Sequence, residues 1–252
     1  MYDDLDRPPL RAGALTRALA PDGWRVEVLS QTPSTNAVVA ARARAGEPAG
    51  LVVVAEQQTA GRGRLDRTWT SPARAGLTFS ALVRPASPVA GWGWIPLLAG
   101  LAVTRALRSR AEVAADLKWP NDVLVGGRKV CGILAEVAAP GAVVIGVGLN
   151  VSARRDELPV ETATSLALEG AASSDRDTIL RAVLRELTEV LADEPGSRIA
   201  YRAGCTTVGR TVRLELPTRV VTGTAEAVDE DGRLVVDGQA YGAGDVVHLR
   251  PG

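Results

Sequence analysis

The sequence predicts an α+β fold in which a mixed or antiparallel sheet with flanking helices is followed by a small all-β unit. The 252 residues, 46% apolar and 23% charged, are typical of a globular chain long enough to bury a core. Short apolar, strand-like segments alternate with helical patterns up to residue 191. Beyond Gly204 only alternating β segments and turns follow, which predicts a β unit of about fifty residues.

The first half of the chain is predicted to contain three strands and two helices. The strands are short, apolar or alternating, and bounded by turn residues: 24–29, 51–55 and 77–83. Ser34 or Thr35 can cap a helix over 36–45 that Gly46 ends. A second helix is expected over 95–110, and it is apolar enough to lie against a sheet.

The second half is predicted to continue the sheet and then form the β unit. Gly126-Gly127 indicates a hairpin turn within a run of strands: 117–125, 130–137 and 143–147. Apolar residues at helical spacing predict one long helix over 176–191. The β unit holds four alternating segments: 211–216, 223–228, 233–237 and 246–249. We therefore divide the chain into three parts: an N-terminal extension over 1–22, a main domain over 23–203 and a C-terminal β domain over 204–252.

Composition and charge disfavour several classes of protein. The 29 basic and 29 acidic residues cancel, whereas a protein that binds mainly to nucleic-acid phosphates carries a basic excess. The longest apolar run, 89–103, is interrupted by Gly, Trp and Pro and is too short to span a bilayer. The N-terminus is acidic and lacks the cationic start and apolar stretch of a signal peptide. We therefore expect a cytoplasmic protein with no membrane segment.

Cysteine, histidine and lysine usage narrows the chemistry. Cys131 and Cys205 are far apart, and the only histidine, His248, lies in an alternating strand pattern near the end. A disulfide framework, a thiolate zinc site, a His-rich metal centre and a nucleophile activated by histidine are therefore disfavoured. The only lysines, Lys118 and Lys129, lie in one short segment, which favours a site that needs a compact ammonium; coding bias is the alternative. Any catalysis is expected to work through positioning and charge.

A loop rich in glycine and arginine, Gln57-Gln-Thr-Ala-Gly-Arg-Gly-Arg64, directly follows an apolar strand and opens a polar stretch that extends to residue 71. Gly61 and Gly63 let the backbone approach a ligand, and Arg62 and its neighbour at the end of the motif offer forked donors for phosphate or carboxylate oxygens. A solvated surface loop is the alternative. The pattern matches neither the P-loop GxxxxGK[ST] nor the dinucleotide motif GxGxxG.

A second polar feature is Lys118-Trp-Pro-Asn-Asp122, which precedes the predicted hairpin that carries Lys129. Pro120 ends a strand and fixes a turn with Asn121 and Asp122 at its tip. The hairpin returns Lys129 to the same region, so that Asp122 through Mg²⁺ and Lys129 directly can meet a triphosphate. An ordinary turn is the alternative for Asn121 and Asp122.

In their order and spacing, these motifs resemble those of biotin–protein ligases over about residues 30–252. The resemblance rests on five segments: Ser34-Thr-Asn36, Glu56-Gln-Gln-Thr-Ala-Gly-Arg-Gly-Arg64, Lys118-Trp-Pro-Asn-Asp122, Arg128-Lys129 with Gly132-Ile-Leu134, and Gly146-Val-Gly-Leu-Asn150. Each motif alone is weak, but five in order are specific. The resemblance implies a biotin/lipoate ligase-like core related to class II synthetases, followed by an SH3-like β-barrel.

The resemblance also implies a two-step reaction. Biotin and MgATP give biotinyl-5′-AMP and pyrophosphate, and the biotinyl group then passes to a lysine of a biotin carboxyl carrier domain of a carboxylase. Adenylyl transfer requires that two anions be brought together and neutralised, and it needs no side-chain nucleophile. This requirement agrees with the sparse histidine and cysteine content. ATP, biotin and Mg²⁺ are therefore the expected ligands.

The resemblance assigns site residues position by position. Biotin is expected to meet Ser34, Thr35, Asn36, Gln58, Gly61, Arg62, Gly63, Arg64, Lys129 and Gly132. ATP or the adenylate is expected to meet Arg62, Arg64, Trp69, Asn121, Lys129 and Asn150. The expected catalytic charges are Lys129, Arg62 and Arg64, and the expected Mg²⁺ ligand is Asp122. Helix capping is the alternative role for Ser34 and Thr35.

Two other functions remain open at this point. One is a lipoate–protein ligase, whose core resembles this family, although Gly-Arg-Gly-Arg followed by Trp-Pro-Asn-Asp favours biotin. The other is a noncatalytic biotin- or nucleotide-binding module. Some biotin ligases carry an N-terminal winged helix and repress transcription, but only about 22 residues precede the first strand here. We therefore expect a ligase without a repressor role and without sequence-specific DNA binding.

Overall fold

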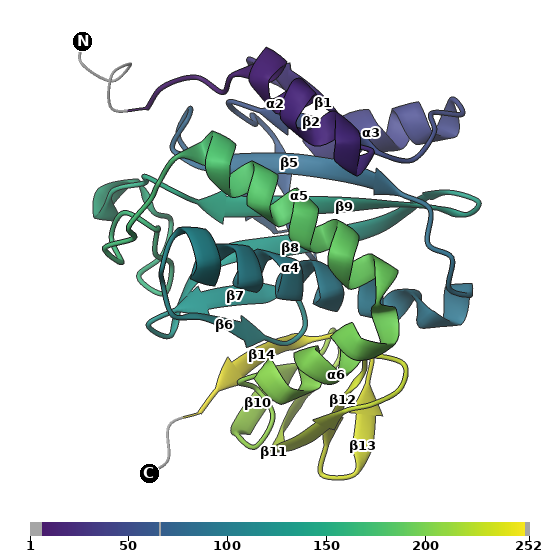
Figure 1. Ribbon diagram of the computed structural model, residues 1–252. Coiled ribbons are helices and arrows are strands. Elements are labelled where there is room, and N and C mark those ends of the chain that lie inside the picture. Colours follow the sequence, from purple (N-terminus) through teal and green to yellow (C-terminus); the bar gives the residue numbers. More distant parts are fainter. Residues whose placement is uncertain (1–6, 66, 250–252) are drawn as a thin grey trace.

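The computed structural model describes residues 7–65 and 67–249 (Figure 1). Its main layer is a seven-stranded mixed sheet with the strand order β1-β2-β5-β9-β8-β7-β6. In this sheet β1 and β2 pair in parallel, and every other neighbouring pair is antiparallel. The strands are β1 (Arg25–Leu29), β2 (Leu51–Ala55), β5 (Gly76–Val83), β6 (Ala115–Lys118), β7 (Asp122–Val125), β8 (Arg128–Ala139) and β9 (Ala142–Asn150). The predicted mixed sheet is confirmed.

Helices cover both faces of this sheet. On one face α4 and α5 pack together, with α2 beside α5, and α3 packs on the opposite face (Figure 1). The α-helices are α2 (Ala12–Leu19), α3 (Thr35–Arg44), α4 (Ile95–Arg110), α5 (Arg176–Ala192) and α6 (Glu194–Gly204). Three short 3₁₀ helices lie at Ala20–Asp22, Val89–Trp94 and Arg155–Glu157. The helix predicted over 95–110 is confirmed to the residue.

Helix α4 is buried on most sides because it lies between the sheet and α5. Together with the 3₁₀ turn before it, Val89–Arg110 is 22 residues long and apolar enough by composition to cross a membrane. The apolar segment is thus longer than the sequence analysis allowed. Its most apolar 18-residue window is 61% buried inside the protein, which is the environment of a core helix.

The central strands β5, β8 and β9 present different residues to the two faces of the sheet. Toward α4 and α5 they bury Phe79, Ile133 and Val147. Toward α3 the cross-strand neighbours are mostly small or polar, in two rows: Thr78 with Gly148 and Gly132, and Ser80 with Gly146 and Leu134. Helix α3 packs at one end of this face, around Leu82 and Val144. It leaves the glycines of the other end uncovered, and the site forms there.

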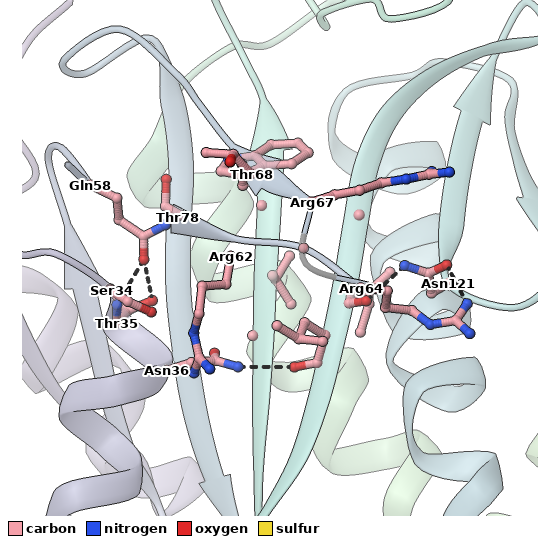
Figure 2. Close-up of a pocket in the computed structure, with 18 of the residues that line it drawn as sticks. Ser34, Thr35, Asn36, Gln58, Arg62, Arg64, Arg67, Thr68, Thr78 and Asn121 are labelled. Carbon is pink, nitrogen blue, oxygen red and sulfur yellow. Dashed lines mark hydrogen bonds between the residues drawn. The ribbon is translucent and has the colours of Figure 1, made fainter. Parts of the chain in front are cut away.

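The polar stretch at 57–71 contains a small hairpin that the sequence did not predict. Strand β3 (Gly61–Arg62) pairs with β4 (Thr68–Trp69). The described residues of this hairpin, 61–65 and 67–69, are termed the arginine loop below. Figure 2 shows it crossing in front of the central strands of the sheet. Three arginines are therefore placed above the uncovered glycines.

The C-terminal domain is a five-stranded antiparallel sheet with the order β13-β12-β11-β10-β14. Its strands are β10 (Thr211–Glu215), β11 (Val220–Val228), β12 (Leu234–Val236), β13 (Gln239–Tyr241) and β14 (Asp245–His248). This confirms the predicted β unit and adds β13. Two buried indoles fix it to the main domain: Trp94 Nε1 donates to Glu230 O at 2.7 Å, and Trp119 Nε1 donates to Gly232 O at 3.0 Å.

Two parts of the main domain differ from the prediction. Residues 117–125 do not form one strand, because residues 119–121 form a turn between β6 and β7. Helices α2 and α6 were not predicted; α2 buries only Leu15 and Leu19, too few apolar positions to reveal a period. Helix α2 packs against β1 and α5, and the boundary proposed after residue 22 stays a prediction.

Candidate active site

A cavity of about 750 Å³ lies over the uncovered glycines, and its size is that of a small-molecule site. All predicted site residues except Gly61 and Asn150 line it. They are Ser34, Thr35, Asn36, Gln58, Arg62, Gly63, Arg64, Trp69, Asn121, Asp122, Lys129 and Gly132. The fold thus brings residues from distant parts of the chain to one place (Figure 2).

One end of the cavity is lined by uncharged hydrogen-bonding groups at the start of α3. Ser34 is the N-cap, and its Oγ accepts from Ala37 N at 3.4 Å. Thr35 donates to Gln58 Oε1 through its backbone N at 2.7 Å and its Oγ1 at 3.0 Å. The buried Ser80 Oγ lies 2.7 Å from Thr35 Oγ1. Helix capping and cavity lining therefore coexist, and the network fixes groups that can donate or accept.

Asn36 connects this neutral end to an ion pair. Its Oδ1 accepts from Ser80 Oγ at 2.6 Å, and its Nδ2 donates to Glu136 Oε2, also at 2.6 Å. The same Glu136 oxygen accepts from Arg62 Nη2 at 3.0 Å. Gly146 makes this approach possible, since a Cβ there would lie 2.1 Å from Asn36 Oδ1. One buried amide thus helps to hold the carboxylate that positions Arg62.

The Trp69 indole lies against two glycines that face each other across β8 and β9. Gly132 and Gly148 are cross-strand partners, and a Cβ on Gly148 would lie 2.4 Å from the Trp69 ring. Only a residue without a side chain leaves room for the indole here. Trp69 Nε1 is buried and has no hydrogen-bond partner among the described residues. A buried donor of this kind is available to an acceptor on a ligand.

Lys129 has a fixed position in the cavity wall. Its backbone N donates to Thr162 O and its backbone O accepts from Thr164 N, both at 2.8 Å. Its Nζ lies 2.6 Å from Asp122 Oδ1, and Lys118 Nζ lies 3.6 Å from Asp122 Oδ2. Both lysines of the chain therefore meet one carboxylate, and this cluster carries a net positive charge.

Arg64 reaches the same region from the arginine loop. Its Nη1 donates to Asn121 Oδ1 at 3.1 Å (Figure 2). Asn121 is itself fixed, because its Nδ2 and its backbone O are each 2.9 Å from the Ile133 backbone group that they bond. Burial lowers the pKa of the Arg64 guanidinium, and the nearby carboxylates of Asp245 and Asp122 oppose this shift. Arg64 is therefore a partly desolvated cation with its donors directed at the cavity wall.

Comparisons with known proteins place this chain in a family. Residues 28–150 match the Biotin/lipoate A/B protein ligase family, and residues 207–249 match the Biotin protein ligase C terminal domain. A biotin–[acetyl-CoA-carboxylase] ligase of Mycobacterium tuberculosis is 46% identical over 97% of this chain and 97% of its own length. The chain belongs to the biotin protein ligase family. The bifunctional ligase/repressor BirA of Escherichia coli is 32% identical over 86% of this chain and 70% of its own length.

Solved structures of biotin protein ligases share the fold. The Aquifex aeolicus enzyme in complex with biotin and ATP matches with a TM-score of 0.75 and 30% identity, over 90% of this chain and 99% of that one. The Leishmania major enzyme in complex with biotinyl-5-AMP matches with a TM-score of 0.62 and 25% identity, over 90% and 98%. The family resemblance drawn from the motifs is confirmed, and so is the α+β fold with its C-terminal β domain.

In this member of the biotin ligase family, two expected site residues lie outside the cavity lining. Gly61 faces Trp69 in the β3–β4 hairpin, where a Cβ would lie 2.4 Å from Trp69 O. Asn150 is buried, and its Nδ2 donates to Thr164 O at 3.0 Å. Both have evident structural roles. Their assignments to biotin and to adenine stay predictions.

Several residues of the site were not found from the sequence. Ser80 and Glu136 belong to the hydrogen-bond network, and Thr78, Arg67 and Asp245 line the cavity. Strand alternation assigns such residues to a face but not to a partner. A usable signal was the run of polar residues at alternate positions of an otherwise apolar strand. Asp245 lies in the other domain, and no motif connects it with the arginine loop.

The described residues that line the cavity include neither Cys131 nor His248. Burial raises the pKa of the Cys131 thiol, so the thiol stays protonated and is a poor nucleophile. His248 Nε2 lies 3.0 Å from Thr207 Oγ1, and burial lowers the pKa of its imidazole to about 4. Both observations agree with the expectation that these two side chains are structural.

Proposed function

We propose that this protein is a biotin–protein ligase that uses MgATP in two steps. In the first step a carboxylate oxygen of biotin attacks the α-phosphorus of ATP, the bond from that phosphorus to the bridging oxygen breaks, and pyrophosphate leaves. In the second step a lysine amine of the acceptor attacks the acyl carbon, an amide forms, and AMP and a proton are released. The proposed acceptor is the carrier domain of an acyl-CoA carboxylase, as the names of relatives suggest.

The observation that carries this proposal is the chemical difference between the two ends of one cavity. The neutral end holds the hydroxyls at the start of α3 and Gln58, which suit the carbonyl and N–H groups of a urea ring. The cationic end holds Lys129, Arg62 and Arg64, which suit a carboxylate and phosphates. A molecule with a urea at one end and a carboxylate at the other fits this polarity. Its carboxylate would lie where a nucleotide phosphate is also attracted.

Lys129 is the group we propose to contribute most to the first step. Its backbone is bonded on both sides and Asp122 orients its ammonium, so the charge is in place before substrates arrive. Fixed charges directed at atoms where negative charge develops lower the barrier without any reorganisation. Arg62 and Arg64 add two further cations from the other side. Positioning and neutralisation of two anions then suffice, and no protein nucleophile is needed.

The nucleotide is proposed to occupy the part of the cavity next to Trp69. The indole offers a flat apolar surface for a base, and its buried N–H has no acceptor among the residues that the structure describes. Asn121 holds Arg64 nearby. A base on the indole would therefore place its phosphates toward the arginines.

Magnesium enters this proposal with ATP, as part of the substrate. Within residues 7–65 and 67–249 there is no group of three His, Cys, Asp or Glu side chains that could hold a metal ion. Asp122, the expected ligand, is already ion-paired with Lys118 and Lys129. Its role as a Mg²⁺ ligand stays a prediction, and no step depends on it here. The ion supplies charge neutralisation on the phosphates.

Pyrophosphate release from MgATP, measured with biotin or with lipoate as the carboxylic acid, tests the proposal. We expect biotin to start the release and a carrier domain to accept the biotinyl group on a lysine. Release that depends on lipoate would make the protein a lipoate ligase. Binding of biotin and ATP without pyrophosphate release would make it a noncatalytic module.

A further inference from the structure

The arginine loop is joined to the C-terminal domain by charged and polar contacts. Arg67 forms an ion pair with Asp245, and Arg64 Nη1 lies 3.5 Å from Gly244 O. Asp245 begins β14 and lines the cavity beside these arginines. The C-terminal domain thus contributes one acidic side chain to a site that is otherwise built from the main domain.

Asp245 is held by rigid surroundings. Strand β14 pairs with β10, where Glu215 lies opposite Asp245. The preceding Gly244 has a φ of +144°, and a Cβ there would lie 2.6 Å from Leu214 Cδ1, so glycine is required at this entry to the strand. Two buried indoles of the main domain fix the whole unit. The Asp245 side chain is 20% exposed and that of Arg67 is 62% exposed, so the acid is the fixed partner and the arginine the mobile one.

The arginine loop has few other contacts that hold it over the cavity. Its two strands have two residues each, and Leu65 is 52% exposed. The three arginines repel one another, which favours an open loop unless counter-charges are present. Glu136 pairs with Arg62 at one edge of the loop, and Asp245 pairs with Arg67 at the other.

We propose that Asp245 is a positioning residue for the first step, a fixed counter-charge that holds the arginine loop over the cavity before ATP binds. This inference rests on the proposed function only in taking MgATP as the ligand. Through Arg67 it keeps Arg64 on Asn121, so that the Arg64 guanidinium meets the phosphates in a loop that is already ordered. The entropy cost of ordering the loop is then met by the fold and not by the binding energy of ATP.

Asp245→Asn tests this role, because it removes the charge and keeps the shape of the side chain. In the ligand-free protein we expect trypsin to cut the arginine loop about five times faster, since a surface ion pair contributes up to about that factor. The KM for MgATP should rise by a similar factor, while the KM for biotin and the Tm stay unchanged. Glu215→Gln is the matched control, because that carboxylate pairs with Arg213 and does not line the cavity. It should change none of these quantities.

Ionic strength separates a charge role from a packing role. The difference in loop cleavage between Asp245→Asn and the parent should shrink at about 0.5 M salt, since exposed ion pairs are screened there. Asp245→Glu should restore part of the parental behaviour. Equal cleavage and an equal KM for MgATP in Asp245→Asn and the parent would overturn the proposal, as would the same changes in Glu215→Gln. A failure of the proposed function looks different: the parent itself would release no pyrophosphate, while the cleavage comparison stays readable.

Discussion

The floor of the cavity and the arginine loop above it are built in opposite ways. The floor consists of β5, β8 and β9, which are paired on both sides and backed by the buried core. The loop is a hairpin of two two-residue strands, and ion pairs to Glu136 and Asp245 hold its edges. The floor therefore determines which shape fits, and the loop brings charge that ligands can reorganise. Changes to the floor should be severe and insensitive to salt, whereas the loop should respond to ligands and ionic strength.

Lys129 is the exception to this division, because it supplies charge from the floor, and its removal should have the largest effect. We expect Lys129→Ala to lower the rate of biotin-dependent pyrophosphate release by about 10²–10³-fold, as the loss of a fixed charge at a developing anion does. Secondary structure and Tm should change little. Lys129→Arg should rescue poorly, since a planar guanidinium occupies different space from an ammonium.

Lys118→Ala is the matched control for Lys129. It removes the other ammonium beside Asp122, but Lys118 does not line the cavity. Its effect on pyrophosphate release should therefore be much smaller. If Lys129→Ala released pyrophosphate at near the parental rate, the catalytic charge would belong to the arginine loop alone.

The next effect tests how strictly the floor determines shape. Gly148→Ala adds a methyl group 2.4 Å from the Trp69 ring, so the indole must move. Overpacking of this kind costs about 1–3 kcal/mol, and we expect the KM for MgATP to rise about tenfold or more. Gly100→Ala is the control, because its Cβ would meet only Leu117 at 3.4 Å and Ile133 at 3.8 Å. An unchanged KM for MgATP in Gly148→Ala would mean that the nucleotide does not use the Trp69 surface.

The same contrast explains how much could be predicted from the sequence. Periodicity and β-branched runs gave the central strands and α4, because buried elements carry strong apolar patterns. The family motifs gave most of the cavity, including Lys129 from the floor and Arg64 from the loop. They named residues but not what those residues touch.

The rest depends on tertiary contacts that leave no local pattern. The pairing of Asp122 with both lysines changes its expected role, and it appears only when β7 and β8 lie side by side. Asp245 is far from the arginine loop in the sequence, and its charge alone does not predict a partner. The split of 117–125 into two strands also needed the structure, since apolar character continues across the turn.

A smaller effect should be seen in the mobility of the loop itself. We expect trypsin to cut the free protein at Arg62, Arg64 or Arg67, and biotin with MgATP to slow this cleavage several-fold more than cleavage elsewhere. Anionic ligands supply counter-charge, and an ordered loop screens a reactive acyl-adenylate from water. Cleavage that is equal with and without ligands would make the loop as rigid as the floor, and it would remove the support for Arg62 and Arg64 as phosphate ligands.

The smallest effect concerns an uncharged contact that acid converts into a charged one. His248 in β14 lies 3.0 Å from Thr207 Oγ1, and burial, followed by the charges of Lys118 and Arg210, lowers the pKa of its imidazole to about 4. The unfolded chain binds this proton near pH 6.5, so the folded state is favoured fully above that pH. As pH falls from about 6.5 to about 4, this contribution should be lost by up to about 1.4 kcal/mol per pH unit. Urea unfolding of the parent and of His248→Gln at pH 7, 6 and 5 measures it, because the carboxylates titrate alike in both proteins. The parent should lose more stability than the variant over this range, and parallel curves would show that the contact holding β14 does not depend on a neutral imidazole.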